Sequence, residues 1–167
     1  EQGQLLLGQG RQVALKLLHG ASTEKPTVLE VFWRSAHQMA ALSHPAIVGI
    51  LNKPREENEI HYVVMECLSG GNLRQWVQGG KLSRVHVMRV LQRLGAGLQY
   101  AHERRVLHRN IKPTNILFDS TGHARLSDFG MVWPAEAIAD ADTRSDRLMY
   151  TAPEEQLAGS AGDPRAD

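Results

Sequence analysis

The sequence predicts an α+β fold divided into two lobes, because strand-like and helix-like patterns occupy different parts of its 167 residues. Short apolar runs typical of strands dominate residues 1–65, with one helical segment among them. Longer segments with apolar residues at helical spacing follow residue 68. We therefore predict a small N-terminal lobe over 1–65, a hinge at 66–68 and a second lobe over 69–167. Clefts between lobes often bind ligands, so we expect a site beside the hinge.

Three strands and one helix are predicted in the first lobe. An apolar run over 12–18 predicts a strand covered on both faces, and 46–51 and 60–65 predict two more. Residues 28–42 place apolar side chains at spacings of three and four, which is typical of an amphipathic helix. These side chains are Leu29, Phe32, Ala36, Met39 and Ala40.

Turn and capping residues organise the second lobe. Asn72 is a suitable N-cap for a short helix that ends at Gly79-Gly80, and Ser83 is a suitable N-cap for a longer helix. Residues 119–122 predict a hairpin turn between two short strands. Five apolar residues predict the buried face of the longer helix: Val85, Met88, Leu91, Leu94 and Leu98.

Composition and charge narrow the classes of function. The formal net charge of +1 gives no electrostatic reason to expect nucleic acid or an anionic membrane as a partner. No segment approaches the run of about 20 apolar residues that a membrane helix needs, and the single cysteine, Cys67, cannot form an internal disulfide. The chain begins at Glu1, without a methionine or a signal-peptide pattern. We therefore expect a cytoplasmic domain that is part of a longer protein.

Four short motifs follow one another in a fixed order. They are Val13-Ala14-Leu15-Lys16, His108-Arg109-Asn110-Ile111-Lys112-Pro113-Thr114-Asn115, Asp128-Phe129-Gly130 and Ala152-Pro153-Glu154. Each alone is a weak signal, but the ordered set resembles the signature of the protein kinase catalytic domain. Lys112-Pro113 resembles the Ser/Thr class in its bacterial-like form, and the resemblance covers nearly the whole chain. It implies a kinase-like fold, with an N-terminal antiparallel sheet, one helix beside it and a partial helical C-terminal lobe.

The same resemblance implies that the cleft binds ATP and Mg²⁺. Phosphoryl transfer in this family depends mainly on positioning and on neutralising charge. Lys16 would hold the α- and β-phosphates, and Lys112 would neutralise the γ-phosphate. Asp128 and Asn115 would supply oxygen ligands to magnesium.

The adenine site is carried over by position alone. The backbone of Glu66 and Leu68 would bind the edge of the adenine ring, and Met65 would be the gatekeeper. Ala14 and Leu117 would lie on the two faces of the ring. Apolar residues at these positions suit a plain hydrophobic core equally well. Four further residues fall where the family stacks a spine of side chains between the lobes: Met39, Ile50, His108 and Phe129.

Three catalytic positions depart from the family pattern. Asn110 replaces the catalytic aspartate, and an amide cannot accept a proton as a carboxylate does; a positioned base is worth about 10²–10⁴ in rate. Counting back from His44-Pro45, Ser35 replaces the helix glutamate that pairs with Lys16, so we expect this lysine to lack a carboxylate partner. Glu30 is a poor substitute, because five helical positions place it roughly 140° away from the required face. Arg147 replaces the family threonine before the last motif.

The chain also resembles a kinase domain that is truncated at both ends. The glycine-rich loop that covers the phosphates is missing, because Gly8-Gln9-Gly10 fits the later hairpin before the lysine strand. At the other end, Asp167 falls where the family begins its next long helix.

We therefore predict a Ser/Thr-kinase-like domain that binds ATP and magnesium but transfers the γ-phosphate to protein Ser/Thr weakly or not at all. It would act as a pseudokinase-like scaffold or nucleotide sensor, with a protein as substrate or partner. The alternative is an active Ser/Thr protein kinase that tolerates Asn110. A third interpretation is a decayed fragment with no function of its own, which the retained Lys16, Lys112, Asn115 and Asp128 disfavour.

Overall fold

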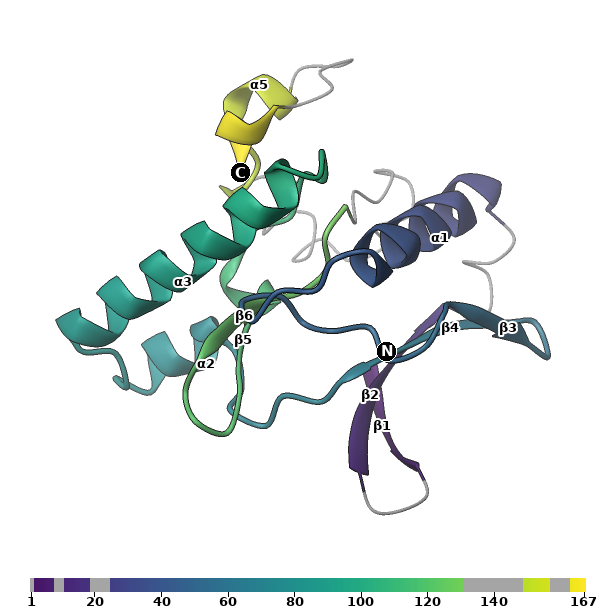
Figure 1. Ribbon diagram of the computed structural model, residues 1–167, viewed down its shortest axis with the longest axis horizontal. Helices are drawn as coiled ribbons and strands as arrows, with labels where there is room; N and C mark the ends of the chain where they lie inside the picture. The colour runs from purple at the N-terminus through teal and green to yellow at the C-terminus, as the bar shows by residue number, and fades with distance from the viewer. Residues whose placement is uncertain (1, 8–10, 19–24, 131–148, 157–162) are drawn as a thin grey trace.

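The computed structural model describes residues 2–7, 11–18, 25–130, 149–156 and 163–167. Four strands and one α-helix form the described residues up to 66, and three α-helices with a hairpin follow them (Figure 1). This arrangement is the predicted α+β layout in two lobes. Within the described residues, no helix is both long enough and apolar enough to span a membrane.

The N-terminal sheet is fully antiparallel, with strand order β1-β2-β4-β3. Its strands are β1 (Gln2–Leu7), β2 (Arg11–Leu18), β3 (Arg55–Glu57) and β4 (Ile60–Glu66). The predicted strands over 12–18 and 60–65 are therefore confirmed. Because β2 lies between two neighbours, the lysine-bearing strand is hydrogen-bonded on both edges, which makes it a rigid support.

The prediction of a strand over 46–51 is wrong. This segment forms only isolated bridges, from Ile47 to Leu126 and from Ile50 to Met65, and β3 appears instead at Arg55–Glu57. The apolar run that suggested a strand has another cause. The segment passes through the core between the two lobes, so its side chains are buried without belonging to the sheet.

Helix α1 (Pro26–Ala40) confirms the predicted helix and begins two residues earlier, with Pro26 at its first position. Its buried residues are Val28, Val31, Phe32, Ser35, Ala36 and Met39. Ala40, which was assigned to the buried face, is exposed. One residue is about 100° of helix rotation, so Ala40 turns away from the face that Met39 occupies.

The second half has the predicted capped helices and hairpin. Asn72 and Gln75 form a capping box at the start of α2 (Leu73–Gln78), and the Ser83 side chain caps α3 (Arg84–His102). Strands β5 and β6 form an antiparallel hairpin. The remaining elements are β5 (Ile116–Phe118), β6 (Ala124–Leu126), α5 (Pro153–Gln156) and two short 3-10 turns, η2 (Pro113–Asn115) and η4 (Pro164–Ala166).

Only part of the apolar face predicted for α3 is buried. Val85, Met88 and Leu91 are 57–59% exposed. The buried residues are instead Val90, Leu94, Gly97 and Ala101. Apolar residues occur on two faces of α3, and only the second face packs on the centre of the molecule. The glycine permits this close packing, because a Cβ at Gly97 would lie 3.1 Å from the Cβ of Ala46.

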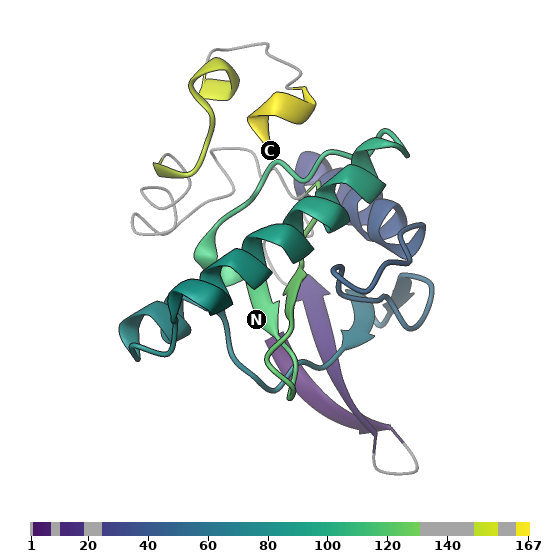
Figure 2. The same cartoon turned by 60° about the vertical axis from the view of Figure 1, so that its left-hand side comes forward.

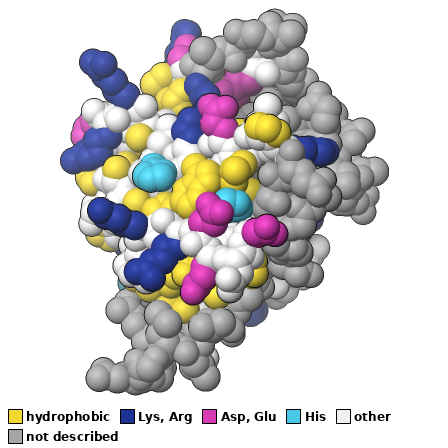
Figure 3. All heavy atoms as spheres, turned by 90° about the vertical axis from the view of Figure 1, so that its right-hand side faces the viewer, with side chains coloured by type: hydrophobic (Ala, Val, Ile, Leu, Met, Phe, Trp, Pro, Cys, Tyr) yellow, Lys and Arg dark blue, Asp and Glu magenta, His cyan; other side chains and the backbone are white. Residues whose placement is uncertain are grey.

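The β5–β6 hairpin lies at the centre, between α3 and the N-terminal sheet (Figures 1 and 2). The main chain of Leu126 exchanges hydrogen bonds with Ala46 and Val48, at 2.8 and 2.9 Å. One hydrophobic core combines side chains from both lobes, including Met39 and Phe118. The two lobes are therefore joined through this hairpin. On the face formed by the α1 and β3 side, charged residues of both signs are interspersed (Figure 3), in keeping with the balanced composition.

Candidate functional site

An ion pair between Lys16 and Asp128 crosses the space between the lobes. Lys16 lies on β2 and Asp128 follows β6, 112 positions later, yet the ammonium and carboxylate are in contact. The two side chains are only 18% and 9% exposed. Burial alone would raise the pKa of Asp128, but the Lys16 ammonium and the Ser127 hydroxyl hold this pKa below its ordinary value. The carboxylate is thus charged.

Asn115 lies beside Asp128 through their shared neighbour, Ser127. The hydroxyl of Ser127 lies 3.0 Å from Oδ2 of Asp128 and 3.2 Å from the main-chain oxygen of Asn115. The side-chain Nδ2 of Asn115 donates to the main-chain oxygen of Asn110 over 2.8 Å. This bond fixes the amide with its Oδ1 oxygen as the remaining acceptor. Ser127 thus links the Asp128 carboxylate to the main chain of Asn115.

The loop that carries Asn110 is held by buried contacts of its backbone. His108 is fully buried and packs on Phe129 with ring centroids 4.4 Å apart, and its main-chain oxygen accepts from the N–H of Gly130 over 2.9 Å. Burial lowers the pKa of His108 to about 4, against the opposing charges of Asp167 and Asp128. The imidazole is therefore neutral, and its Nδ1 accepts from the N–H of Asn110 over 3.2 Å.

Asp167 is a functional position whose role the sequence did not reveal. Its carboxylate accepts from the main-chain N–H groups of His108 and Arg109, both over 2.7 Å, and contacts Nε2 of His102 at 2.8 Å. Arg109 has a positive φ of 60°, and Asp128 one of 66°. Such conformations are uncommon for these residue types and persist where surrounding contacts enforce them. The hydrogen bonds of Asp167 hold the loop at Arg109 in this conformation.

Ser35 lies where the count from His44-Pro45 predicts, on the α1 face that meets the Asp128-Phe129-Gly130 turn. Its buried hydroxyl donates to the main-chain oxygen of Phe129. Glu30 is exposed, as its position on the helix predicts. The expectation that Lys16 lacks a carboxylate partner is wrong, because Asp128 takes that place. Position 35 of α1 carries a serine, and the Lys16 ammonium contacts the carboxylate of Asp128.

The residues assigned to adenine surround one edge of the core. Ala14 lies opposite Met65 in the β2–β4 register, and Leu117 bridges to Asn72. Ala14, Leu68 and Leu117 are partly buried and pack against the common core, a position that suits contact with a flat ring. Their assignment to adenine stays a prediction.

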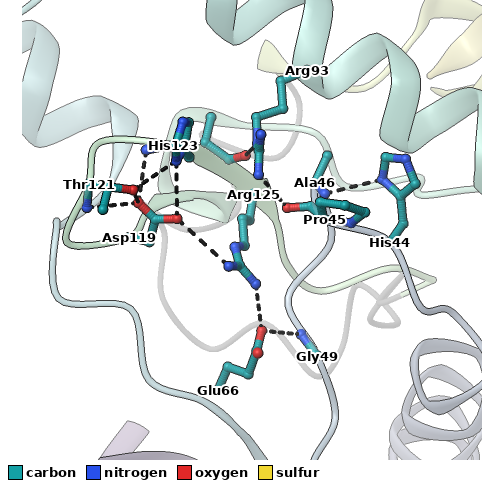
Figure 4. A network of polar contacts seen from close by, with 11 residues as sticks. His44, Pro45, Ala46, Gly49, Glu66, Arg93, Asp119, Thr121, His123 and Arg125 are labelled. Atoms are coloured by element: carbon teal, nitrogen blue, oxygen red, sulfur yellow. Dashed lines mark hydrogen bonds and ion pairs between the residues drawn. The ribbon is translucent and has the colours of Figure 1, made fainter.

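Glu66 has a side-chain role that no sequence pattern indicated. Its carboxylate accepts from the N–H of Gly49 over 3.0 Å and from Arg125 over 2.7 Å (Figure 4). Arg125 also approaches Asp119 at 3.7 Å. The hinge is thereby tied to β6 by side chains 59 positions apart in the sequence. Lys112 is half-buried, and its main-chain oxygen accepts from the N–H of Asn115 over 2.9 Å.

Some predicted positions lie outside the described residues. Arg147 and the Gly8-Gln9-Gly10 hairpin are among them. The strands on either side of that hairpin, β1 and β2, do pair antiparallel, as the prediction requires.

Comparison with known proteins decides the family. The profile of the protein kinase domain matches residues 5–167. The chain belongs to the protein kinase domain family. This kinase domain is 30% identical over 154 residues to the serine/threonine-protein kinase PrkC of Bacillus subtilis, covering 90% of the chain and 24% of PrkC. It is 33% identical over 165 residues to the serine/threonine-protein kinase PknA of Mycobacterium tuberculosis, covering 95% of the chain and 38% of PknA.

A solved structure supports the same conclusion. The crystal structure of the Mycobacterium tuberculosis PknI kinase domain, determined for a cysteine-to-alanine mutant, superposes with a TM-score of 0.72 at 27% identity. The match covers 93% of this kinase domain and 58% of the PknI chain. The predicted kinase-like fold is confirmed, and the chain spans less than two fifths of the length of PrkC or PknA.

Proposed function

We propose that this kinase domain binds ATP with magnesium beside Lys16 and Asp128, and that it transfers the γ-phosphate to protein Ser/Thr weakly or not at all. The observation that carries the proposal is the part-buried ion pair between these two residues, in a chain with an amide at the position of the catalytic base. The pair supports nucleotide binding, and Asn110 argues against efficient transfer.

The residues present fit a magnesium–nucleotide complex. Asp128 and the Oδ1 of Asn115 are oxygen donors of the kind that magnesium prefers. Mg-ATP, when bound, supplies the divalent cation and the transferable phosphoryl group. Asp128 would hold the divalent cation, and Lys16 would hold phosphate oxygens. Neither charge is left buried and unpaired, which would be costly.

Asn110 limits what the site does after binding. Its amide can orient a substrate hydroxyl but has no basic oxygen to take the proton. The lost base corresponds to roughly 3–5 kcal/mol of the barrier, at about 1.36 kcal/mol per tenfold change in rate. The proposed role is therefore that of a nucleotide sensor or scaffold for a protein partner.

One observation favours the alternative of an active Ser/Thr kinase. The loop around Asn110 is held by main-chain contacts with Asn115, His108 and Asp167, none of which uses the Asn110 side chain. Its geometry is thus independent of whether residue 110 is an amide or an acid. Phosphoryl transfer depends mainly on positioning, so a well-placed amide would leave measurable activity.

Thermal unfolding with and without Mg-ATP tests the proposal. A ligand that binds only the folded state stabilises it by about 2.7 kcal/mol at 100 times its Kd. We expect Mg-ATP to raise the Tm, and Lys16→Ala or Asp128→Ala to remove most of that rise. Lys53→Ala, at an exposed lysine, is the matched control and should keep it. An unchanged Tm in the folded wild-type domain would contradict the proposal.

A further inference from the structure

A cavity lies between α2, the first half of α3 and the β5–β6 turn, away from the Lys16–Asp128 pair. Its volume is about 280 Å³, and neither Lys16 nor Asp128 is among the residues that line it. Its lining combines cationic and aromatic side chains, namely Trp76, His86, Arg89, Arg93 and His123, over an apolar floor that includes Val90. On α3, positions 86, 89 and 93 share one face, because they are three and four residues apart.

Arg93 provides a fixed positive charge on the cavity wall. Its Nε donates to the main-chain oxygen of Ala124 over 3.0 Å, and its Nη2 donates to that of Pro45 over 2.8 Å (Figure 4). Both partners are carbonyls, which satisfy N–H donors but leave the guanidinium charge unneutralised. Within the described part of the chain, no carboxylate pairs with Arg93. A charge positioned in this way favours an anion without further ordering of the side chain.

Arg89 adds a second guanidinium one helical turn earlier. It lines the same cavity, is exposed, and makes no hydrogen bond or ion pair with any residue that the structure describes. Paired arginines of this kind bind phosphate and carboxylate groups through two parallel N–H bonds. Arg93 is fixed and Arg89 is free to close on a ligand.

The nearby carboxylate of Asp119 does not neutralise these arginines. Its Oδ1 accepts from the N–H of Thr121 over 2.9 Å, from the hydroxyl of Thr121 over 2.6 Å and from the N–H of His123 over 3.0 Å (Figure 4). Its Oδ2 faces Arg125 and Nδ1 of His123, each at 3.7 Å. The carboxylate of Asp119 therefore interacts with its own turn and with Arg125 on β6. The cavity keeps its positive charge.

We infer that this cavity binds the phosphoryl group of a phosphorylated peptide. A phosphoserine carries a charge of about −1.5 to −2 and three strong acceptor oxygens, whereas a carboxylate offers one charge and two oxygens. Two guanidinium groups, with His86 and His123 beside them, match the greater charge and the additional acceptor oxygen of the phosphoryl group. The indole of Trp76 stacks on Phe118 with centroids 3.8 Å apart, so it is a rigid apolar wall for the flanking peptide. This binding is independent of the nucleotide site and goes beyond the proposed function.

Fluorescence anisotropy with a labelled phosphoserine peptide flanked by alanine and glycine tests the inference. The same peptide with serine or glutamate in place of phosphoserine provides the comparison. We expect the phosphoserine peptide to bind most tightly and inorganic phosphate to displace it. Arg89→Ala should weaken binding by about tenfold or more, since it removes a charge-assisted contact. Arg93→Lys should weaken it as well, with a melt confirming that the fold is retained.

Two control variants make the outcome decisive. Arg104→Ala removes the same charge from beyond the far end of α3, where Arg104 lies over the Tyr100 ring, and should leave the affinity unchanged. Lys16→Ala tests whether the peptide binds in the other cleft. Equal binding of the serine, glutamate and phosphoserine peptides would overturn the inference. So would a loss of affinity caused by Lys16→Ala or Arg104→Ala but not by Arg89→Ala.

Discussion

The residues that would hold a nucleotide and the residues that would transfer its phosphate have diverged to different degrees. Lys16 and Asp128 keep opposite charges in contact, and the main chain of Asn115 is linked to Asp128 through Ser127. Ser35 and Asn110, in contrast, replace two carboxylates of the family pattern with neutral groups. The two sets are linked through the Asp128-Phe129-Gly130 turn and the Asn110–Asn115 contact.

The neutral replacements still have structural roles. Ser35 bonds the main-chain oxygen of Phe129, and the main-chain oxygen of Asn110 receives the side chain of Asn115. The shape of the cleft is therefore maintained by contacts that do not need the catalytic charges. Binding and transfer are separable properties in such a site, and the predictions below test how far they separate.

Restoring the acid at position 110 has the largest expected effect. If the missing base is the main defect, Asn110→Asp should raise phosphotransfer by about 10² or more. Transfer of radiolabelled phosphate to the domain itself and to a basic protein measures this, with Asp128→Ala as the blank. Ser35→Glu added to Asn110→Asp should give more than the product of the separate gains, because the two carboxylates act in one catalytic unit. Robust transfer by the unmodified domain would instead favour the active-kinase alternative.

Acidification should destabilise the framework that both sets of residues share. The pKa of His108 is about 4 in the folded state against an ordinary value of 6.5. The unfolded chain therefore binds the proton first, and stability falls as the pH drops from about 6.5 to 4. At about 1.36 kcal/mol per pH unit, the loss is about 3 kcal/mol.

Urea unfolding at pH 7 and at about pH 4.5 measures this loss, since the midpoint follows stability. His108→Phe retains a ring against Phe129 but cannot titrate. This variant should start less stable at neutral pH and lose much less stability on acidification. A pH dependence equal to that of the wild type would show that another group is responsible.

Removing the Ser35 hydroxyl should have the smallest effect of the three. Ser35→Ala leaves the buried oxygen of Phe129 without its partner, at a cost of about 1–3 kcal/mol in the free energy of unfolding. Ser43→Ala, at an exposed serine just after α1, is the matched control and should cost little. If the two variants have the same free energy of unfolding, the Ser35 hydroxyl does not stabilise the turn at Phe129.

The polar residues of the candidate site could be predicted because they belong to short motifs. Lys16, Asn115 and Asp128 each lie in such a motif. The position of Ser35 follows from counting residues back from His44-Pro45 without a gap. The Lys16–Asp128 ion pair itself could not be predicted, because it joins two residues that are 112 positions apart in the sequence.

Contacts between distant segments left no signal in the sequence. Glu66 and Arg125 meet across 59 positions, and Asp167 reaches back to His108. The buried face of α3 was misjudged for a related reason. Periodicity shows that a helix has apolar faces, but which of two faces packs inward depends on the segments that arrive from elsewhere.

Calorimetric titration of Mg-ATP into the wild-type domain and into Asn110→Asp tests the separation of binding from transfer most directly. If the nucleotide is held by Lys16, Asp128 and Asn115, both proteins should bind it with the same Kd within about threefold, which is under 1 kcal/mol. No heat of binding in the wild type, together with clear binding in Asn110→Asp, would show that the residues of binding and transfer form one unit and would contradict the account.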